Sequence, residues 1–425
     1  MENTQKPAHP ERSRNKWLTR DVFNWSVFDF ANSTFATIVV AFVYAIYFKK
    51  VVALNQPIGD FYWASSINIS MIIVAVLGPV LGAASDYYGN KKKYLIFFTY
   101  LCVGATALLY FITEGMILWG MVLFIFANIG FQAGLGFYDA FIKEIALFEN
   151  YNKVSSLGYA IGYLGSLASL GAVIVLQDAP RLTFVACAVL FFLFSLPMFL
   201  FVKERPSPPA PLPEGEGNLN ISAAKNFISI GINRTRDTLR HISKYKNIRT
   251  FLLSYFLYID GVNTIIFFAG NYAQTTLNFE ISDLILFFII VQITALTGSF
   301  LFGYIADKKG TKGTLSFIII SWAVLTLLVF FANDKATFLI IGAFAGTFLG
   351  SSQALSRSFM GRLTPDEKKT EFFGFYSLFE KTSTILGPLT FGLVSWLTGS
   401  QRYAVISILM FFIAGYLLFR RVEKA

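Results

Sequence analysis

The sequence has few of the residues that build catalytic, metal-binding and cross-linked sites. Its 425 residues include only two cysteines and two histidines. Cys102 and Cys187 both fall within apolar runs, which excludes a disulfide framework. His9 and His241 each stand alone without the spacing of metal ligands, and the chain has neither a Ser-His-Asp arrangement nor a phosphate-binding glycine loop. These absences predict a protein that is not an enzyme and that needs no metal and no cofactor.

Charged residues are also scarce. They make up 14% of the chain, whereas hydrophobic residues make up 55% and include 47 phenylalanines. Such a chain is too apolar for a water-soluble protein of this length, so we predict an all-α protein that crosses the lipid bilayer many times. The first 23 residues lack the apolar core and cleavage site of a signal peptide, so the first apolar run is expected to act as its own insertion signal.

The charges that remain are unevenly placed. The net charge is +10, and basic residues gather before the first apolar run and after every second run, for example at residues 91–93 and 308–312. By the positive-inside rule, this alternation predicts an integral protein of the plasma (inner) membrane with both termini in the cytoplasm. Topology thus accounts for the basic balance. No stretch interleaves basic residues with exposed aromatic residues, so we expect no nucleic-acid partner.

Twelve apolar runs of about 20 residues are each long enough to cross a bilayer. They predict twelve transmembrane helices in two pseudo-symmetric six-helix bundles, at residues 24–202 and 248–421, with cytoplasmic tails at 1–23 and 422–425. In the linker between them, residues 203–247, a proline-rich strip precedes apolar residues near helical spacing, which indicates an interfacial helix on the cytoplasmic face. For its role, a solvated tether that only joins the bundles is favoured.

A charged motif after the second span recurs after the eighth. GAASDYYGNKKK at residues 82–93 is matched by GYIADKKGTK at residues 303–312, and two copies at equivalent places indicate an internal duplication. The glycines permit tight turns or close helix packing, the aspartate can accept from a helix N-terminus, and the lysines are expected beside lipid headgroups. The residues assigned to conformational switching are Gly82, Asp86, Gly89, Lys91, Gly303, Asp307 and Gly310.

A second repeat lies inside the spans. Span one carries Asp29, Asn32 and Ser33, and span seven carries the same D-x-x-N-[ST] order at residues 260–264. The repeat predicts a pseudo-twofold axis along the membrane normal, with a substrate site between the two halves.

Several polar side chains lie deep in the predicted spans. An ionised side chain at the bilayer centre costs at least about 2.5–3.5 kcal/mol, so each must face the bundle interior and find a partner. The residues predicted for substrate binding or proton coupling are Asp29, Asn32, Asp260, Asn263, Gln353, Arg357, Glu380 and Lys381. We expect a central cavity for a zwitterionic or carboxylate-bearing solute. Lys381 or Arg357 would hold the carboxylate, and Asp260 or Asp29 would take an amine or a coupling proton.

The alternative is that these charges form interhelical ion pairs that favour one conformational state. Asp260 and Lys381 lie deep in their runs, which favours a role in function. Asp29 and Arg357 lie nearer the cytoplasmic ends, and for them a gate and a cavity role have equal weight.

Two spans carry further local signals. In span four, Asn128, Gln132 and Asp139 share one helix face, and Asp139 and Glu144 are expected at the inner gate or against lipid headgroups. In span eleven, the Gly-Pro pair at residues 387–388 predicts a kink, because proline leaves a carbonyl four residues earlier without its hydrogen bond.

Two sets of motifs resemble known families. The G-x-x-x-D-x-x-G-x-K-K pattern of residues 82–92 resembles the loop signature of the major facilitator superfamily, a group of twelve-helix secondary transporters. Within it, the chain resembles the Atg22-like family in both halves. The matching stretches are FDFANSTFAT at 28–37, AIGYLG at 160–165, QALSRS at 353–358, and EFFGFYSLFEK through Gly-Pro at 371–388.

The resemblance implies a secondary active transporter, and the fungal members are implied to release amino acids from the vacuole. We therefore expect a small-molecule solute, an amino acid or small peptide, to be exported by alternating access with coupling to protons or another ion. Bundle packing is compatible with a monomer. Two alternatives stay open: a carrier of anionic sugars or cell-wall fragments, and a membrane receptor or scaffold that has kept the fold without transport.

Overall fold

The computed structural model describes residues 17–41, 43–54, 56, 58–176, 178–204, 223–384 and 386–423. The predicted N-terminal tail up to residue 16, the proline-rich part of the linker within residues 205–222, and the last two residues lie outside this range. Each of the two halves is built from helices.

The first half forms six spans. Its helices are α1 (Arg20–Phe35), α2 (Val43–Tyr47), α3 (Ile58–Tyr88), α4 (Lys91–Leu108), α5 (Ile117–Ala140), α6 (Ile142–Ile145), α7 (Tyr151–Val175) and α8 (Pro180–Phe201). Two π-helical segments, Ala36–Ala41 and Phe48–Val52, extend the first span on either side of α2. The span of α1 and α2 therefore departs from regular α-helix.

The linker contributes α9 (Ala223–Arg240), and the second half follows. Its helices are α10 (Lys246–Leu277), α11 (Ile281–Lys309), α12 (Thr311–Phe331), α13 (Lys335–Leu363), α14 (Lys369–Thr382), α15 (Leu386–Thr398) and α16 (Gln401–Arg420). Eleven of the described helical segments are long and apolar enough to cross a membrane. The eleventh predicted span is divided into α14 and α15, with a break that begins at Ser383 just before the Gly-Pro pair.

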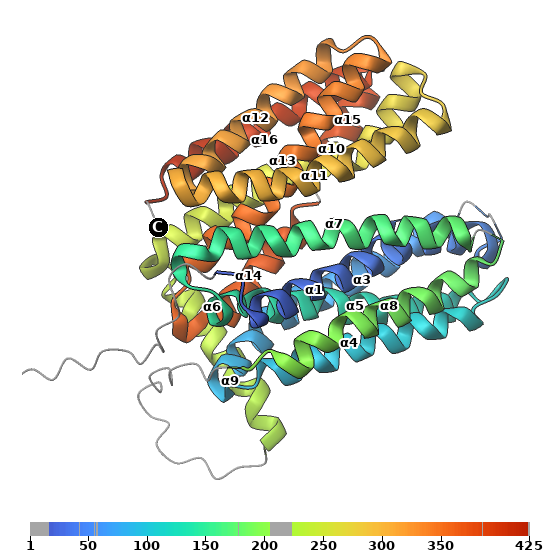
Figure 1. Ribbon diagram of the computed structural model, residues 1–425. Helices are drawn as coiled ribbons and strands as arrows, with labels where there is room; N and C mark the ends of the chain where they lie inside the picture. Colours follow the sequence, from blue (N-terminus) through green and yellow to red (C-terminus); the bar gives the residue numbers. More distant parts are fainter. Residues whose placement is uncertain are drawn as a thin grey trace, which may run out of the picture.

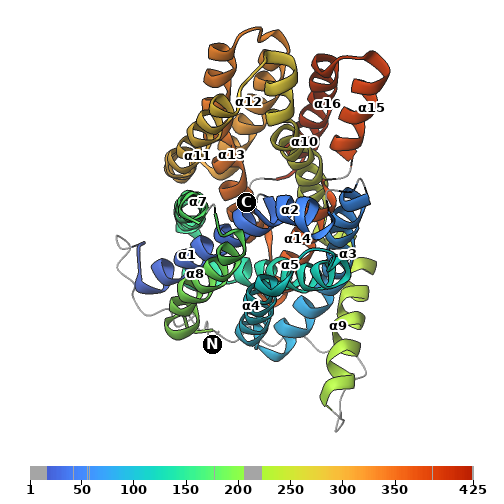
Figure 2. The same cartoon turned by 90° about the vertical axis from the view of Figure 1, so that its right-hand side faces the viewer.

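The two halves lie side by side and diverge from one end of the molecule to the other (Figure 1). They meet at the end where α9 and the C-terminus lie, which we call the closed face; the opposite end is the open face. Helix α14 belongs to the second half, yet it packs on α3 and α5 of the first half, while α7 packs on α11 and α13. Figure 2 shows the second half above the first, with α14 between them and α9 beside α3.

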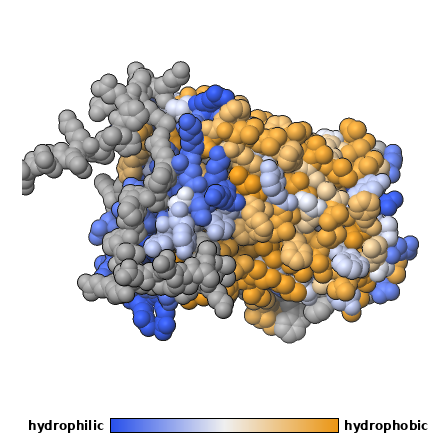
Figure 3. Space-filling view, turned by 90° about the horizontal axis from the view of Figure 1, so that it is seen from below, coloured by the Kyte–Doolittle hydropathy of each residue, from blue (hydrophilic) through white to orange (hydrophobic). Residues whose placement is uncertain are grey.

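The surface carries a broad apolar belt (Figure 3). Hydrophilic side chains gather at the closed face and at the opposite end, and the belt lies between them. Large apolar side chains on the spans, such as Ile72, Val76 and Phe97, are more than half exposed. In water this exposure would be costly, so the belt is the surface that contacts lipid.

Candidate functional site

A cavity of about 320 Å³ lies between the two halves. Its polar lining comes from α1, α5 and α7 of the first half and from α13 and α14 of the second half: Asp29, Asn32, Ser33, Gln132, Asp139, Tyr159, Tyr163, Gln353, Arg357, Glu380 and Lys381. The Tyr163 hydroxyl donates across the halves to Gln353 Oε1 at 2.8 Å. Six of the eight residues predicted for substrate or coupling therefore share this one cavity.

Arg357 joins the two halves beside the cavity. Its Nη1 lies 3.1 Å from Asp29 Oδ2 and 3.1 Å from Asp139 Oδ1. Its Nε donates to the Ser155 hydroxyl at 2.9 Å, and Nη2 donates to the Ser155 carbonyl at 2.8 Å and to Asp29 at 3.2 Å. The guanidinium also lies 4.8 Å from the Trp25 ring centroid and 4.3 Å from that of Tyr159.

These contacts use all the donor directions of the Arg357 guanidinium. The side chain is 1% exposed, so a solute carboxylate could reach it only by displacing Asp29 or Asp139. Of the two predicted carboxylate holders, Lys381 alone is left available in this state. The sequence predicted Asp139 either at the inner gate or against lipid headgroups. In the structure it contacts Arg357 beside the cavity, so the headgroup position is wrong. The helix face it shares with Asn128 and Gln132 was the available signal, because a polar stripe inside a span must face the protein interior.

Glu380 and Lys381 bring the most accessible charges to the cavity. Lys381 Nζ lies 3.2 Å from Glu380 Oε1. The Lys381 side chain is 13% exposed and the Glu380 side chain is 29% exposed. From charge alone, Asp260, Glu380 and Asp29 were candidate partners of Lys381, and in the structure its partner is Glu380. An adjacent cation and anion that face a polar cavity can each exchange its partner for the opposite charge of a solute.

Asp260 and Asn263 lie away from this cavity, although they repeat the sequence pattern of Asp29 and Asn32. Asp260 is fully buried, and its two carboxylate oxygens accept from the Gly387 N–H at 3.0 and 2.9 Å. Asn263 Nδ2 lies 3.5 Å from Ser383 Oγ at the end of α14. The first N–H groups of a helix have no partner within it, so Asp260 caps α15 where the span breaks.

The helix-capping role and the proton-coupling role of Asp260 predict different results for its substitutions. Asp260→Ala is expected to lower the stability of the protein by about 1–2 kcal/mol, because the α15 N-terminus loses its acceptor. Asp260→Asn keeps one acceptor oxygen and should retain most of the stability and the transport activity. Thermal unfolding and transport measured on both variants check this. A stable Asp260→Asn protein without proton-driven transport would instead support the coupling role predicted from the sequence.

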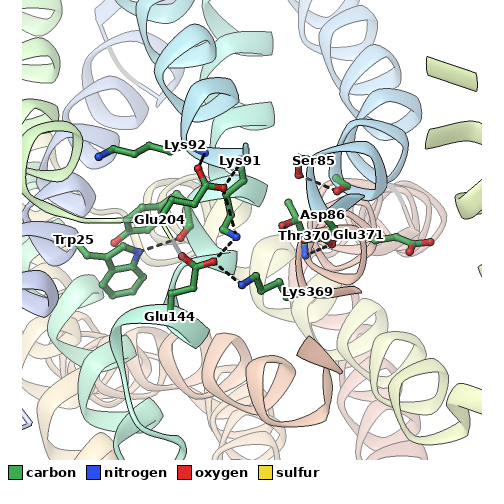
Figure 4. Close-up of polar contacts among 12 residues, drawn as sticks. Trp25, Ser85, Asp86, Lys91, Lys92, Glu144, Glu204, Lys369, Thr370 and Glu371 are labelled. Atoms are coloured by element: carbon green, nitrogen blue, oxygen red, sulfur yellow. Dashed lines mark hydrogen bonds and ion pairs between the residues drawn. The ribbon is translucent and has the colours of Figure 1, made fainter. Parts of the chain in front are cut away.

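The repeated loop motif forms the contacts of the closed face (Figure 4). Asp86, at the end of α3, accepts from the N–H groups of Thr370 and Glu371 at 2.7 and 2.9 Å and from the Thr370 hydroxyl at 2.7 Å. An aspartate of the first half thereby caps α14 of the second half. In the repeat, Asp307 accepts from Asn152 Nδ2 of α7 at 3.0 Å and lies 3.4 Å from Lys153 Nζ. Each half thus has one motif aspartate that accepts hydrogen bonds from a helix of the other half.

The glycines of the motif allow this close approach. A Cβ at Gly82 would lie 2.9 Å from the Thr370 carbonyl carbon, and one at Gly303 would lie 2.7 Å from Ser156 Cβ. Side chains there would push the halves apart. Gly89 and Gly310 follow the helix ends with φ of 62° and 92°, a backbone region that disfavours other residues.

Lys91 does not reach the headgroups as predicted. Its side chain is 1% exposed, forms an ion pair with Glu144, and lies 3.8 Å from Glu204 Oε1. Glu144 also lies 2.6 Å from Lys369 Nζ of the second half, so it bridges a lysine of each half at the closed face (Figure 4). Burial raises the pKa of the Glu204 carboxyl, while Lys91 and the N–H groups of Lys91 and Lys92 oppose that rise. The motif lysine is thus a buried part of the closed face.

Comparison with solved structures identifies the fold. The structure of FucP in the outward conformation has a TM-score of 0.74 at 12% identity and covers 96% of this chain and 98% of its own. The human organic anion transporter MFSD10 has a TM-score of 0.72 at 13% identity, with 94% and 99% covered. With helical spans in two halves around a shared polar cavity, the protein has the all-α fold of the major facilitator superfamily. The predicted fold is confirmed.

Sequence comparison identifies the family. The family model described as vacuole effluxer Atg22 like matches residues 62–425. The uncharacterized MFS-type transporter YxiO of Bacillus subtilis is 30% identical over 425 residues, 96% of both chains. Autophagy-related protein 22 of Kluyveromyces lactis is 26% identical over 287 residues, 64% of this chain and 58% of its own. The chain belongs to the Atg22-like family of membrane transporters.

Proposed function

We propose that the protein exports amino acids or small peptides, as a monomer, by alternating access coupled to protons. The observation that carries the proposal is the Glu380–Lys381 pair in a cavity shared by both halves. A zwitterion presents one carboxylate and one ammonium, which complement Lys381 and Glu380 respectively. Membership of a family named for a vacuole effluxer supports the direction.

The closed face is proposed to be cytoplasmic. It carries the basic motif loops, and α9 with its arginines lies on the same side. Positive loops remain in the cytoplasm during insertion, so this orientation follows from charge. The protein, placed in the plasma membrane in this way, has its cytoplasmic gate shut and the halves apart on the outer side.

Alternating access then consists of exchanging one set of contacts for another. The Asp86 cap on α14 and the Asp307 contact with Asn152 hold the cytoplasmic side shut. Opening that side requires both to break, and a new contact at the outer side must offset their loss. Two related aspartates at related places allow the halves to rock about the cavity between them.

Proton coupling is proposed at the Arg357 cluster. Asp29 and Asp139 share one guanidinium, so the cluster holds two potential negative charges against one positive charge. A proton on either carboxylate would balance the cluster and weaken its hold across the halves. Asp260 is a poorer candidate, because its carboxylate faces the α15 N-terminus and does not line the cavity.

The proposal is tested by uptake into proteoliposomes of purified protein, with labelled amino acids and dipeptides and an imposed pH gradient. We expect gradient-dependent accumulation of zwitterionic solutes. Lys381→Gln is expected to raise KM about 10- to 150-fold, because a hydrogen bond to a charged group contributes about 1.5–3 kcal/mol. Lys335→Gln is the matched control, since Lys335 pairs with Asp283 at the open face and its side chain is 43% exposed.

Two results would contradict the proposal. An unchanged KM in Lys381→Gln would assign the lysine to a structural pair with Glu380. Failure of every amino acid and dipeptide with folded protein would instead favour an anionic sugar as solute, or a protein that does not transport.

A further inference from the structure

Helix α9 of the linker docks on the cytoplasmic half of α3. Its residues Ile230, Arg234 and Thr238, four apart in sequence, are at most 9% exposed, whereas Ile232 between them is 48% exposed. Spacing of four places the three buried side chains on one stripe of the helix. A tether that only joined the two halves would have no reason to bury two polar residues and one apolar residue on a single face.

The fit of α9 on α3 is close. A Cβ at Gly231 would lie 3.0 Å from Val80 Cγ1 and nearer still to the Val80 carbonyl oxygen, so only glycine permits this approach. Further along, the Arg234 guanidinium lies 5.4 Å from the ring centroid of Tyr87. The helix is thus seated against the residues that lead directly to Asp86.

The same stripe also reaches the second half. The Thr238 hydroxyl accepts from Lys368 Nζ and forms a hydrogen bond with the Glu371 carboxylate. Glu371 is one of the two residues whose N–H groups bind Asp86. Just beyond α9, the Tyr245 ring packs 4.9 Å from that of Phe372. One face of α9 therefore touches α3 on one side of the gate and the start of α14 on the other.

We infer that α9 is a clamp on the cytoplasmic gate, which holds α3 and α14 together and must release Thr238 before the gate opens. The inference rests on the alternating access of the proposed function. The linker follows α8 of one half and leads into α10 of the other, so α9 lies between the two halves along the chain. Its contact with Glu371 adds to the cap that Asp86 provides.

Unpaired polar atoms weaken the contact between the clamp and the gate. In the described part of the chain, Arg234 Nη1 and Glu371 Oε1 are buried at this interface without a hydrogen-bond partner in the protein. A buried polar atom without a partner lowers the stability of the state that contains it. The closed clamp is therefore weaker than a fully satisfied interface of the same size, and separation of α9 from α14 lets these atoms meet water.

The test measures the gate itself and needs no solute, so failure of the transport proposal leaves it intact. Spin labels are placed at Lys93 and Lys309, exposed residues at the closed-face ends of α4 and α11, in full-length protein whose two buried cysteines have been replaced. Pulsed electron paramagnetic resonance then gives the populations of short and long distances. Thr238→Val keeps the shape and removes both hydrogen bonds, and Gly231→Leu prevents docking on Val80.

We expect both variants to raise the ratio of long to short distances, by about tenfold for Thr238→Val, which removes hydrogen bonds to two charged groups. Arg236→Ala, on the exposed face of α9, is the control and should leave the ratio unchanged. Thermal unfolding verifies that each variant is folded. Unchanged distance distributions in both clamp variants, or an equal change in Arg236→Ala, would overturn the inference and return α9 to the role of a tether.

Discussion

Replacing Arg357 by alanine is expected to abolish transport and to destabilise the protein by about 3–5 kcal/mol. The guanidinium is 1% exposed and is the cation shared by Asp29 and Asp139. Its removal leaves two carboxylates facing one another in a buried site, where an unpaired charge is costly. It also removes a direct link between α13 of the second half and α1 and α5 of the first half. Fluorescence-detected thermal unfolding and proteoliposome uptake measure the two losses.

A charge-neutral variant separates stability from function at this cluster. Arg357→Gln combined with Asp29→Asn and Asp139→Asn removes the three charges together, so the unpaired-charge cost disappears and much of the stability should return. Proton-driven transport should stay absent, because no titratable group remains in the cluster. Arg421→Ala, at an exposed arginine near the C-terminus, controls for loss of any arginine and should be neutral. Coupled transport in the triple variant would contradict the proposed coupling site.

Replacing Asp86 by alanine is expected to shift the protein from the state with a closed cytoplasmic gate toward the state with an open one. The carboxylate accepts two backbone N–H groups and one hydroxyl from the start of α14. Hydrogen bonds to a charged group contribute about 1.5–3 kcal/mol, which corresponds to a change of about 10- to 150-fold in the ratio of open to closed gate. The distance between labels at Lys93 and Lys309 measures that ratio.

The pseudo-symmetric partner provides the comparison. Asp307→Ala removes the contacts with Asn152 and Lys153, which include no helix cap, so a shift in the same direction but smaller is expected. Asp178→Ala, at an exposed residue toward the open face, should leave the ratio unchanged. If Asp86→Ala left the distances unaltered while Asp307→Ala changed them, the gate would depend on α7 and α11 and not on the cap of α14.

Much of the candidate site could be predicted from sequence for one physical reason. A polar side chain in a membrane span must face the protein interior, so the list of intramembrane polar residues is nearly a list of cavity residues. Asp29, Gln353 and Lys381 came from that rule. Asp260 came from the same rule and yet lies elsewhere, because a broken helix offers free N–H groups that satisfy a buried carboxylate as well as a cavity does. The Gly-Pro pair indicated a kink in the span, but it did not indicate that Asp260 would bind the N–H group exposed there.

The sequence could not predict which charged residues of one half pair with which residues of the other half. Charge alone allowed Arg357 to pair with Asp29, Asp260 or Glu380, and it left out Asp139, which the fold brings within 3.1 Å. Lys91 was expected at the headgroups, and only the tertiary fold brings it to Glu144 of α6 and encloses it there. Neutralisation by a nearby acid makes burial of a lysine possible, and nearness depends on helix packing rather than on sequence spacing.

The sequence by itself determined the twelve spans, the duplicated halves and the repeated loop motif. Each of these follows from local chemistry: the length of apolar runs, the placement of cations and the order of a few residues along one segment. Only the tertiary structure decided which charges meet, where the eleventh span breaks and that α9 docks at the gate. Those outcomes depend on distances between segments more than a hundred residues apart, which are set by how two six-helix halves come together at one face.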